Sequence, residues 1–192
     1  MEQRTVHLFM FDTLADWESG FVIAGINNPQ FQAHPGAYHV QTVALDTHPV
    51  TTIGGLRIVP DRLLSDLNPA KSAMLILSGG TAWDRGENMQ AVEVAKVFLA
   101  AGVPVAAICG ATFGLARGGL LDTVQHTSNS LKYLQATNYA GAAYYQQQPA
   151  VTDGNLITAN SFKPVDFAYH IFKKLGVYSP EILEVWYKQR TT

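Results

Sequence analysis

The chain has 192 residues, of which 47% are hydrophobic and 15% charged, a composition that fits one compact domain with a sizeable core. Its 13 basic and 15 acidic residues give a net charge of −2 without any long basic run, so a nucleic-acid partner is not expected. A single cysteine cannot form an intrachain disulfide, and no stretch approaches the roughly 20 apolar residues of a membrane helix. We therefore expect a single domain spanning residues 1–192 in the cytoplasm, with no membrane partner.

Strand and helix patterns alternate along the chain. Two continuous apolar runs, 72–80 and 103–108, are typical of strands buried on both faces of a parallel sheet. The predicted elements, in chain order, are a strand at 5–11, a helix at 16–27, a strand at 38–45, a hairpin at 50–59, a short helix at 61–67, a strand at 72–80, a helix at 87–101, a strand at 103–108, helices at 110–121 and 130–137, a hairpin at 150–159, and helices at 164–175 and 179–189. Because parallel strands need crossover connections, this order predicts a doubly wound α/β sandwich with helices on both faces.

The only cysteine, Cys109, stands where an apolar strand ends and a helix rich in glycine and alanine begins. Ligands of such sheets bind beyond the carboxyl ends of the strands. A nucleophile at a sharp turn from strand to helix needs small residues two positions before and after it, and here these are Ala107 and Ala111. A buried structural cysteine is the alternative, but the small neighbours favour a nucleophile elbow.

The position of Cys109 at a helix start also predicts an activated thiol. The helix dipole and free amides there favour a thiolate, which would lower the pKa of the thiol from about 8.5. The Gly110 amide, together with those of Gly79 and Gly80 after the preceding strand, could then form a donor pocket for a developing oxyanion.

With these features the sequence resembles the ThiJ/PfpI family of the class I glutamine-amidotransferase-like superfamily. The resemblance rests on "LILSGG", on "AAICGATFGLARGGLLD" and on the acidic loop after the first strand. It implies a flavodoxin-like sandwich with Cys109 as nucleophile, an acidic side chain hydrogen-bonded to its sulfur, and a homodimer. Asp16 and Glu18 compete for the acidic role, and side chains two apart on a helix point to nearly opposite faces, so only one can reach the thiol. We choose Asp16, which stands at the helix start as the family's carboxylate does.

Two positions depart from the family pattern. Many members have a histidine directly after the nucleophile, where this chain has Gly110, so peptidase activity is not expected. Asn129 replaces a histidine often found near the site. His126, three residues earlier, should point elsewhere if the segment is a strand. Both Asn129 and His126 are nevertheless kept as possible pocket residues.

Other candidate sites are less well supported. The six histidines include no close pair on a helix and no cluster with cysteine, so no metal site is expected. No phosphate-binding glycine loop is present, and the carboxylates of "FDTLADWE" would repel a flavin phosphate, so no cofactor is expected. Trp17 and Trp83 follow the loops that should flank Cys109, and each is either the roof of a pocket or a core aromatic.

These features predict a small enzyme in which the Cys109 thiolate attacks an electrophilic carbon of an amide, carbonyl or isocyanide. The alternative is an oxidative-stress sensor or protective protein whose Cys109 becomes a sulfinate without turnover. A scaffold that only binds a ligand is a third possibility. In the first case the partner is a small-molecule substrate.

Overall fold

The computed structural model describes residues 3–191. Its helices are α1 (Asp16–Asn27), α2 (Met89–Ala100), α3 (Gly110–Arg117), α4 (Leu131–Gln135), α5 (Pro164–Leu175) and α6 (Pro180–Thr191). Its strands are β1 (Arg4–Phe9), β2 (Tyr38–Ala44), β3 (Val50–Thr51), β4 (Arg57–Ile58), β5 (Arg62–Leu63), β6 (Ser72–Leu77), β7 (Val105–Ile108), β8 (Ala150–Asp153) and β9 (Leu156–Ala159). Short 3-10 turns cover Leu64–Asp66, Pro69–Lys71 and Gly141–Tyr144.

The described strands form one large sheet and one small hairpin. The seven-stranded sheet has the order β5-β2-β1-β6-β7-β9-β8, and every pair in it is parallel except β8 with β9. From β1 the chain moves outward to β2, and from β6 it moves the other way to β7. The strand order therefore reverses between β1 and β6, which is where sheets of this kind hold ligands.

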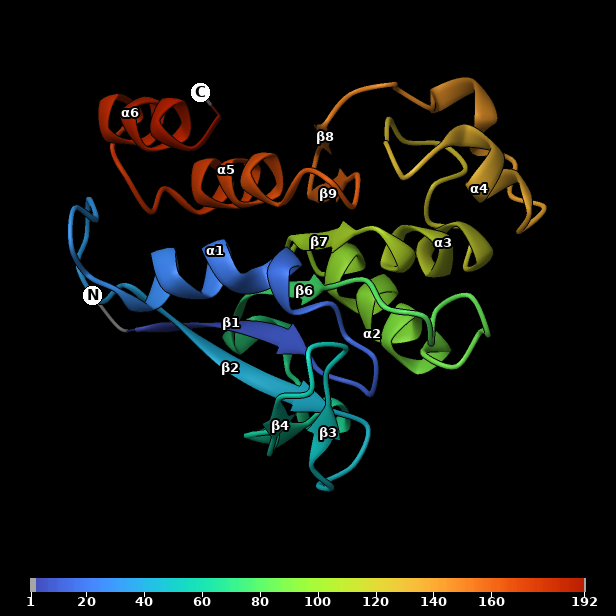
Figure 1. The fold of residues 1–192 in the computed structure, drawn as a ribbon, viewed down its shortest axis with the longest axis horizontal. Helices are drawn as coiled ribbons and strands as arrows, with labels where there is room; N and C mark the ends of the chain where they lie inside the picture. Colours follow the sequence, from blue (N-terminus) through green and yellow to red (C-terminus); the bar gives the residue numbers. More distant parts are fainter. Residues whose placement is uncertain (1–2, 192) are drawn as a thin grey trace.

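Helices cover both faces of this sheet (Figure 1). The figure shows α1, α5 and α6 together on one side, with α2 across the sheet from them. Right-handed crossovers explain this arrangement, because connections that run in opposite directions along a sheet lie on opposite faces. Both central strands β6 and β7 are buried along their full lengths, as their continuous apolar sequences predict.

The predicted order of elements and the doubly wound, mostly parallel α/β architecture are confirmed. The helix expected at 61–67 is wrong in its first part. Residues Arg62–Leu63 form the edge strand β5, paired with Val43 and Ala44 of β2, and only Leu64–Asp66 turns as a 3-10 helix. Pairing with an open sheet edge outweighs the local helical pattern.

Two glycines of α1 provide a matched test of how this helix packs on α5. A Cβ at Gly25 would lie 2.3 Å from Cζ of Phe172, whereas a Cβ at Gly20 would meet nothing within 4 Å. We expect Gly25→Ala to lower the free energy of unfolding by about 1–3 kcal/mol, because the buried ring must shift. Gly20→Ala should instead raise it by about 0.5–1 kcal/mol, since alanine is the better helix former. Denaturant unfolding of both variants measures this, and equal effects would contradict the close helix contact.

Candidate active site

The candidate site lies at the carboxyl edge of three neighbouring strands, β1, β6 and β7. The register pairs Phe9 with Leu77 and Leu77 with Ala107, so the loops that follow these strands emerge side by side. The first loop leads into α1, the second contains Gly79 and Gly80, and the third is the single residue Cys109 before α3. The site therefore forms next to the point where strand order reverses.

The backbone at Cys109 has the conformation of a sharp elbow. Its φ of 58° and ψ of −126° lie in a region that side-chain-bearing residues rarely adopt and that costs about 1–3 kcal/mol. Hydrogen bonds hold it there: the Cys109 amide donates to the Ala159 carbonyl (3.1 Å), and the Thr112 hydroxyl donates to the Cys109 carbonyl (2.6 Å). Ala107 and Ala111 are fully buried beside it. Cys109 is half-buried and stands at the start of α3.

The carboxyl group beside the sulfur belongs to Glu18. This side chain is fully buried, and its Oε2 accepts a hydrogen bond of 2.6 Å from the Gly79 amide. The carboxyl also lies beside the Cys109 thiol, and their interaction lowers the pKa of the carboxyl and raises the pKa of the thiol. A Cβ placed at Gly79 would lie 2.7 Å from Glu18 Oε2 and 2.8 Å from the sulfur, so only glycine fits at this position. The carboxyl and the thiol therefore meet over the Gly79 backbone.

The choice of Asp16 as the acid at the sulfur is wrong. Its Oδ2 accepts a hydrogen bond of 2.7 Å from the Gly54 amide in the turn between β3 and β4. The helical offset explains the difference, since the buried face of α1 contains Glu18, Val22 and Ile26, four residues apart. Asp16 lies off that face and anchors the hairpin instead.

The pKa values of Glu18 and Cys109 both lie above their ordinary values, and burial is the largest cause for each. Burial raises the pKa of Glu18 above its ordinary value. Burial first, and then the charge of Glu18, raise the pKa of the Cys109 thiol to about 12, while Asn129 and the Gly110 amide act in the opposite direction. The expected lowering of the thiol pKa is therefore wrong, because desolvation and a like charge outweigh the helix start. Between the raised pKa of Glu18 and that of the thiol, the pair holds one proton.

Asn129 contacts the sulfur from the other side. Its Oδ1 accepts a hydrogen bond from the Ser161 amide (3.0 Å), which turns its Nδ2 toward Cys109 Sγ at 3.5 Å. This side chain thus offers the sulfur a neutral donor where many relatives are expected to have a titratable histidine. It stabilises negative charge on sulfur without being able to take the proton.

The three glycines expected to supply oxyanion donors differ in their surroundings. The Gly79 amide is already bound to Glu18, so it is not free for a ligand, and this part of the expectation is wrong. Gly80 and Gly110 both line the cavity at Cys109. The Gly110 amide is directed at the sulfur. Two backbone amides therefore remain as candidates.

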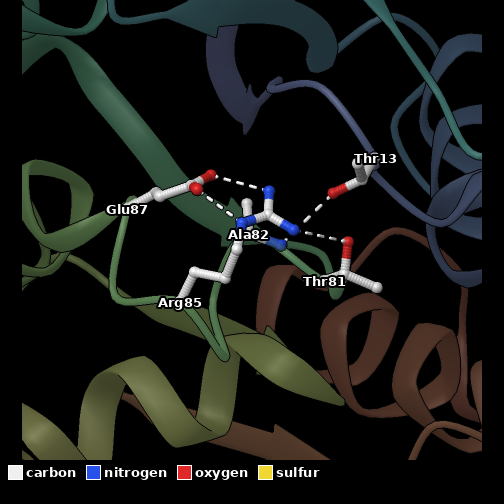
Figure 2. A network of polar contacts seen from close by, with 5 residues as sticks. All are labelled: Thr13, Thr81, Ala82, Arg85 and Glu87. Atoms are coloured by element: carbon white, nitrogen blue, oxygen red, sulfur yellow. Dashed lines mark hydrogen bonds and ion pairs between the residues drawn. The ribbon is translucent and has the colours of Figure 1, made fainter.

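A polar network fixes the loop that contains Gly80 (Figure 2). Arg85 Nη2 donates to Glu87 Oε2 at 2.8 Å, and Arg85 Nη1 donates to the Thr81 hydroxyl at 3.3 Å. The Ala82 amide donates to the Thr13 hydroxyl at 3.3 Å, which links this loop to the one after β1. The Arg85–Glu87 pair is exposed and contributes little stability, so its main effect is to set the shape of the loop.

A cavity of about 330 Å³ opens over the sulfur. Trp17 and Asn129 line it, as expected for a pocket, together with Glu18 and Cys109. The rest of its wall is formed by Ala15, Ile53, Gly80, Thr81, Asp84, Gly110, Tyr133, Ser161 and Phe162. Of these, only Gly80 and Gly110 are predicted as site residues from the sequence. Ser161 and Phe162 lie two and three residues after the end of β9, the neighbour of β7, so the rule that ligands bind beyond strand ends could have found them.

Two of the proposed pocket residues lie elsewhere. Trp83 is buried in the core against Phe9 and Phe11, and its indole nitrogen donates to the Ser78 carbonyl at 2.8 Å. His126 is also fully buried, with its Nδ1 2.8 Å from the Val124 carbonyl. Neither lines the cavity at Cys109; both are packed inside the fold, where their polar atoms find partners.

Comparison with known proteins identifies the family of the chain. The sequence profile of the DJ-1/PfpI family matches residues 4–174. The chain belongs to this family. The ThiJ/PfpI resemblance of the sequence is thereby confirmed.

Relatives of the DJ-1/PfpI family match nearly the whole chain. A Bacillus subtilis protein called "Uncharacterized protease YoaZ" is 41% identical over 197 residues, covering 100% of this chain and 93% of its own. A crystal structure of a thiJ/pfpI family protein from Bacillus anthracis is 39% identical with a TM-score of 0.92, over 100% of this chain and 92% of that one. The DJ-1 superfamily protein Atu0886 from Agrobacterium tumefaciens is 31% identical with a TM-score of 0.87, over 98% and 100%. The flavodoxin-like α/β fold is thus shared at full length.

Proposed function

We propose that this DJ-1/PfpI family protein is an enzyme in which Cys109 attacks the electrophilic carbon of a small amide, carbonyl or isocyanide. The observation that carries the proposal is the strained elbow at Cys109, which presents the sulfur to a cavity beside a buried carboxyl. Strain of this kind persists only where the surrounding structure holds it, and it is concentrated at functional sites.

Glu18 is the proton carrier of the proposed reaction. Of the two side chains beside the sulfur, Glu18 can take a proton and Asn129 cannot. With a carbonyl substrate, sulfur forms the new bond to carbon, its proton passes to the Glu18 carboxylate, and the carbonyl electron pair moves to oxygen. The Gly80 and Gly110 amides would hold that oxyanion, and protonated Glu18 then returns its proton to the leaving group or product.

Proteolysis is not part of the proposal, although the name of the Bacillus subtilis relative mentions a protease. No histidine lines the cavity within residues 3–191, and Gly110 follows the nucleophile directly. A cavity of about 330 Å³ lies near the lower end of the range for small-molecule sites, about 300–1,000 Å³. A small substrate therefore fits the site better than a polypeptide.

The second candidate is an oxidative-stress sensor or protective protein at the same cysteine. The observation that favours it is the set of donors around the sulfur, Asn129 Nδ2 and the Gly110 amide, which could hold the oxygens of a sulfinate. In that case peroxide would convert Cys109 to a stable sulfinate and no substrate would be turned over.

Turnover assays with Cys109→Ser separate the two candidates. We expect steady turnover of at least one of glyoxal, methylglyoxal, an isocyanide or glutamine by the native protein, and its loss in Cys109→Ser. Mass spectrometry after peroxide titration is the parallel measurement. A stable sulfinate with no turnover of any of these compounds would contradict the enzyme and select the sensor.

The proposal also covers the partners of the protein: a small-molecule substrate and a second copy of the chain in a homodimer. Within residues 3–191, no helix has both the length and the apolar character needed to cross a bilayer. In the same residues, no three His, Cys, Asp or Glu side chains are grouped to hold a metal ion. For a homodimer, the exposed apolar side chains Ile182 and Val185 of α6 offer a surface that a second copy could cover.

A further inference from the structure

The charges around the cavity at Cys109 are all of one sign. Its ionisable carboxyl groups are those of Glu18 and Asp84, and no lysine, arginine or histidine is among its lining residues in the part of the chain described. Arg85 belongs to the same loop as Asp84, but its guanidinium is bound to Glu87 and Thr81. A substrate that brings its own carboxylate would therefore meet two acidic groups and no cation.

The mouth of this cavity is formed by apolar side chains that nothing covers. Trp17 is 55% exposed, Ile53 51% and Phe162 87%. Single exposed apolar residues are common on protein surfaces, but these three come from α1, the β3–β4 hairpin and the segment after β9 and meet at one opening. A ligand with an apolar body would cover them and remove that surface from water.

Polar groups are instead concentrated at the reacting end of the cavity. The Asn129 amide and the Gly80 and Gly110 backbone surround the sulfur, and the Tyr133 hydroxyl is engaged by Asp84 Oδ1. The cavity thus has a polar floor and an apolar opening. This division matches a molecule with one polar reactive group attached to a hydrocarbon or aromatic portion.

We propose that the site selects uncharged substrates with an aromatic or otherwise apolar portion, bound by Trp17 and Phe162, and rejects substrates bearing a carboxylate. The inference rests on the proposed function, since it names the class of substrate that Cys109 attacks. Among the candidate reactions it favours aryl or alkyl carbonyl compounds and isocyanides over glutamine and keto acids.

Alkylation of the single cysteine tests this selectivity without requiring turnover. Iodoacetamide and iodoacetate differ in charge at nearly equal size, and N-phenyl iodoacetamide adds an aromatic ring. For each reagent, the second-order rate constant at Cys109 is divided by the rate constant with 2-mercaptoethanol. This division corrects for the intrinsic reactivity of the reagents. We expect the ratio of the iodoacetate rate to the iodoacetamide rate to be about tenfold lower at Cys109 than at the free thiol. The ratio of the N-phenyl iodoacetamide rate to the iodoacetamide rate should be about tenfold higher at Cys109 than at the free thiol.

Four variants connect these ratios to named side chains. Trp17→Ala and Phe162→Ala should each reduce the preference for the phenyl reagent by about two- to tenfold. Phe31→Ala is the control, because Phe31 is equally an exposed phenylalanine but lines a separate hollow between α1 and α6. Asp84→Asn should raise the iodoacetate rate with little effect on iodoacetamide.

Equal charge ratios at Cys109 and the free thiol, or a phenyl preference that survives both aromatic substitutions, would overturn the inference. These outcomes are distinct from failure of the proposed function, which would appear as absence of turnover while the alkylation preferences remain.

Discussion

Replacing Glu18 with glutamine should lower turnover by about 10²- to 10⁴-fold, the usual loss when a positioned proton carrier is removed. Glutamine keeps the size of the side chain and its contact with the Gly79 amide, but it cannot take the proton from sulfur. Asp16→Asn is the matched control, since Asp16 binds the Gly54 amide instead of the sulfur. It should change turnover only a few-fold. Steady-state kinetics of both variants on whichever substrate is turned over measure the effect, and a larger loss in Asp16→Asn would reverse the assignment.

The pH dependence of kcat/KM should also depend on Glu18. Because burial raises the pKa of Glu18, the acid limb of kcat/KM should lie above the ordinary range of a glutamate. Below that pKa the pair holds two protons, Glu18 cannot accept another, and the rate falls. In Glu18→Gln this limb should disappear.

The second large effect concerns the stability of the elbow. At most positions glycine is less stabilising than alanine, but Cys109→Gly should unfold with a free energy about 1–2 kcal/mol higher than Cys109→Ala. Both variants lose the sulfur, and only glycine relieves the strain of a φ of 58°. Denaturant unfolding measures the difference between the two variants.

Ala111→Gly provides the control for this comparison. Ala111 lies in α3 two residues after the elbow, where the backbone is helical. There glycine should destabilise the protein by about 1 kcal/mol. If Cys109→Gly proves less stable than Cys109→Ala by a similar amount, the elbow is not strained and the main support for a functional cysteine is lost.

The fold could be predicted largely from sequence because its signals are local. The apolar runs that became β6 and β7, and the small residues around Cys109, directly reflect burial and close backbone approach. The sequence pattern does not predict the edge strand β5, because its two residues take their conformation from pairing with β2, which lies outside the local pattern. Local patterns do not report such pairing.

The position of Glu18 on the buried face of α1 is visible in the sequence. Glu18 precedes Val22 and Ile26 by four and eight residues, so helical periodicity alone places it on the buried face of α1. The analogy with a carboxylate at the helix start favoured Asp16 and outweighed this evidence. The periodicity was the better guide because it describes this helix itself.

The cavity wall was the least predictable part. Ile53, Asp84, Tyr133 and Phe162 come from separate loops and a short helix, and only the tertiary structure brings them together. The pKa of Cys109 was also beyond the sequence, because it depends on how fully the thiol is desolvated and on the exact neighbour that carries the charge.

The central claim is that Cys109 and Glu18 share one proton, and the pH dependence of Cys109 alkylation by iodoacetamide tests it most directly. Between the raised pKa of Glu18 and the thiol value of about 12, the fraction of molecules with the proton on the carboxyl does not change with pH. The native protein should therefore react at a nearly constant rate between these two pKa values, with Asp16→Asn behaving alike, whereas Glu18→Gln should react about tenfold faster with each pH unit until its thiol is ionised. A native rate that climbs with pH as steeply as that of Glu18→Gln would contradict the shared proton.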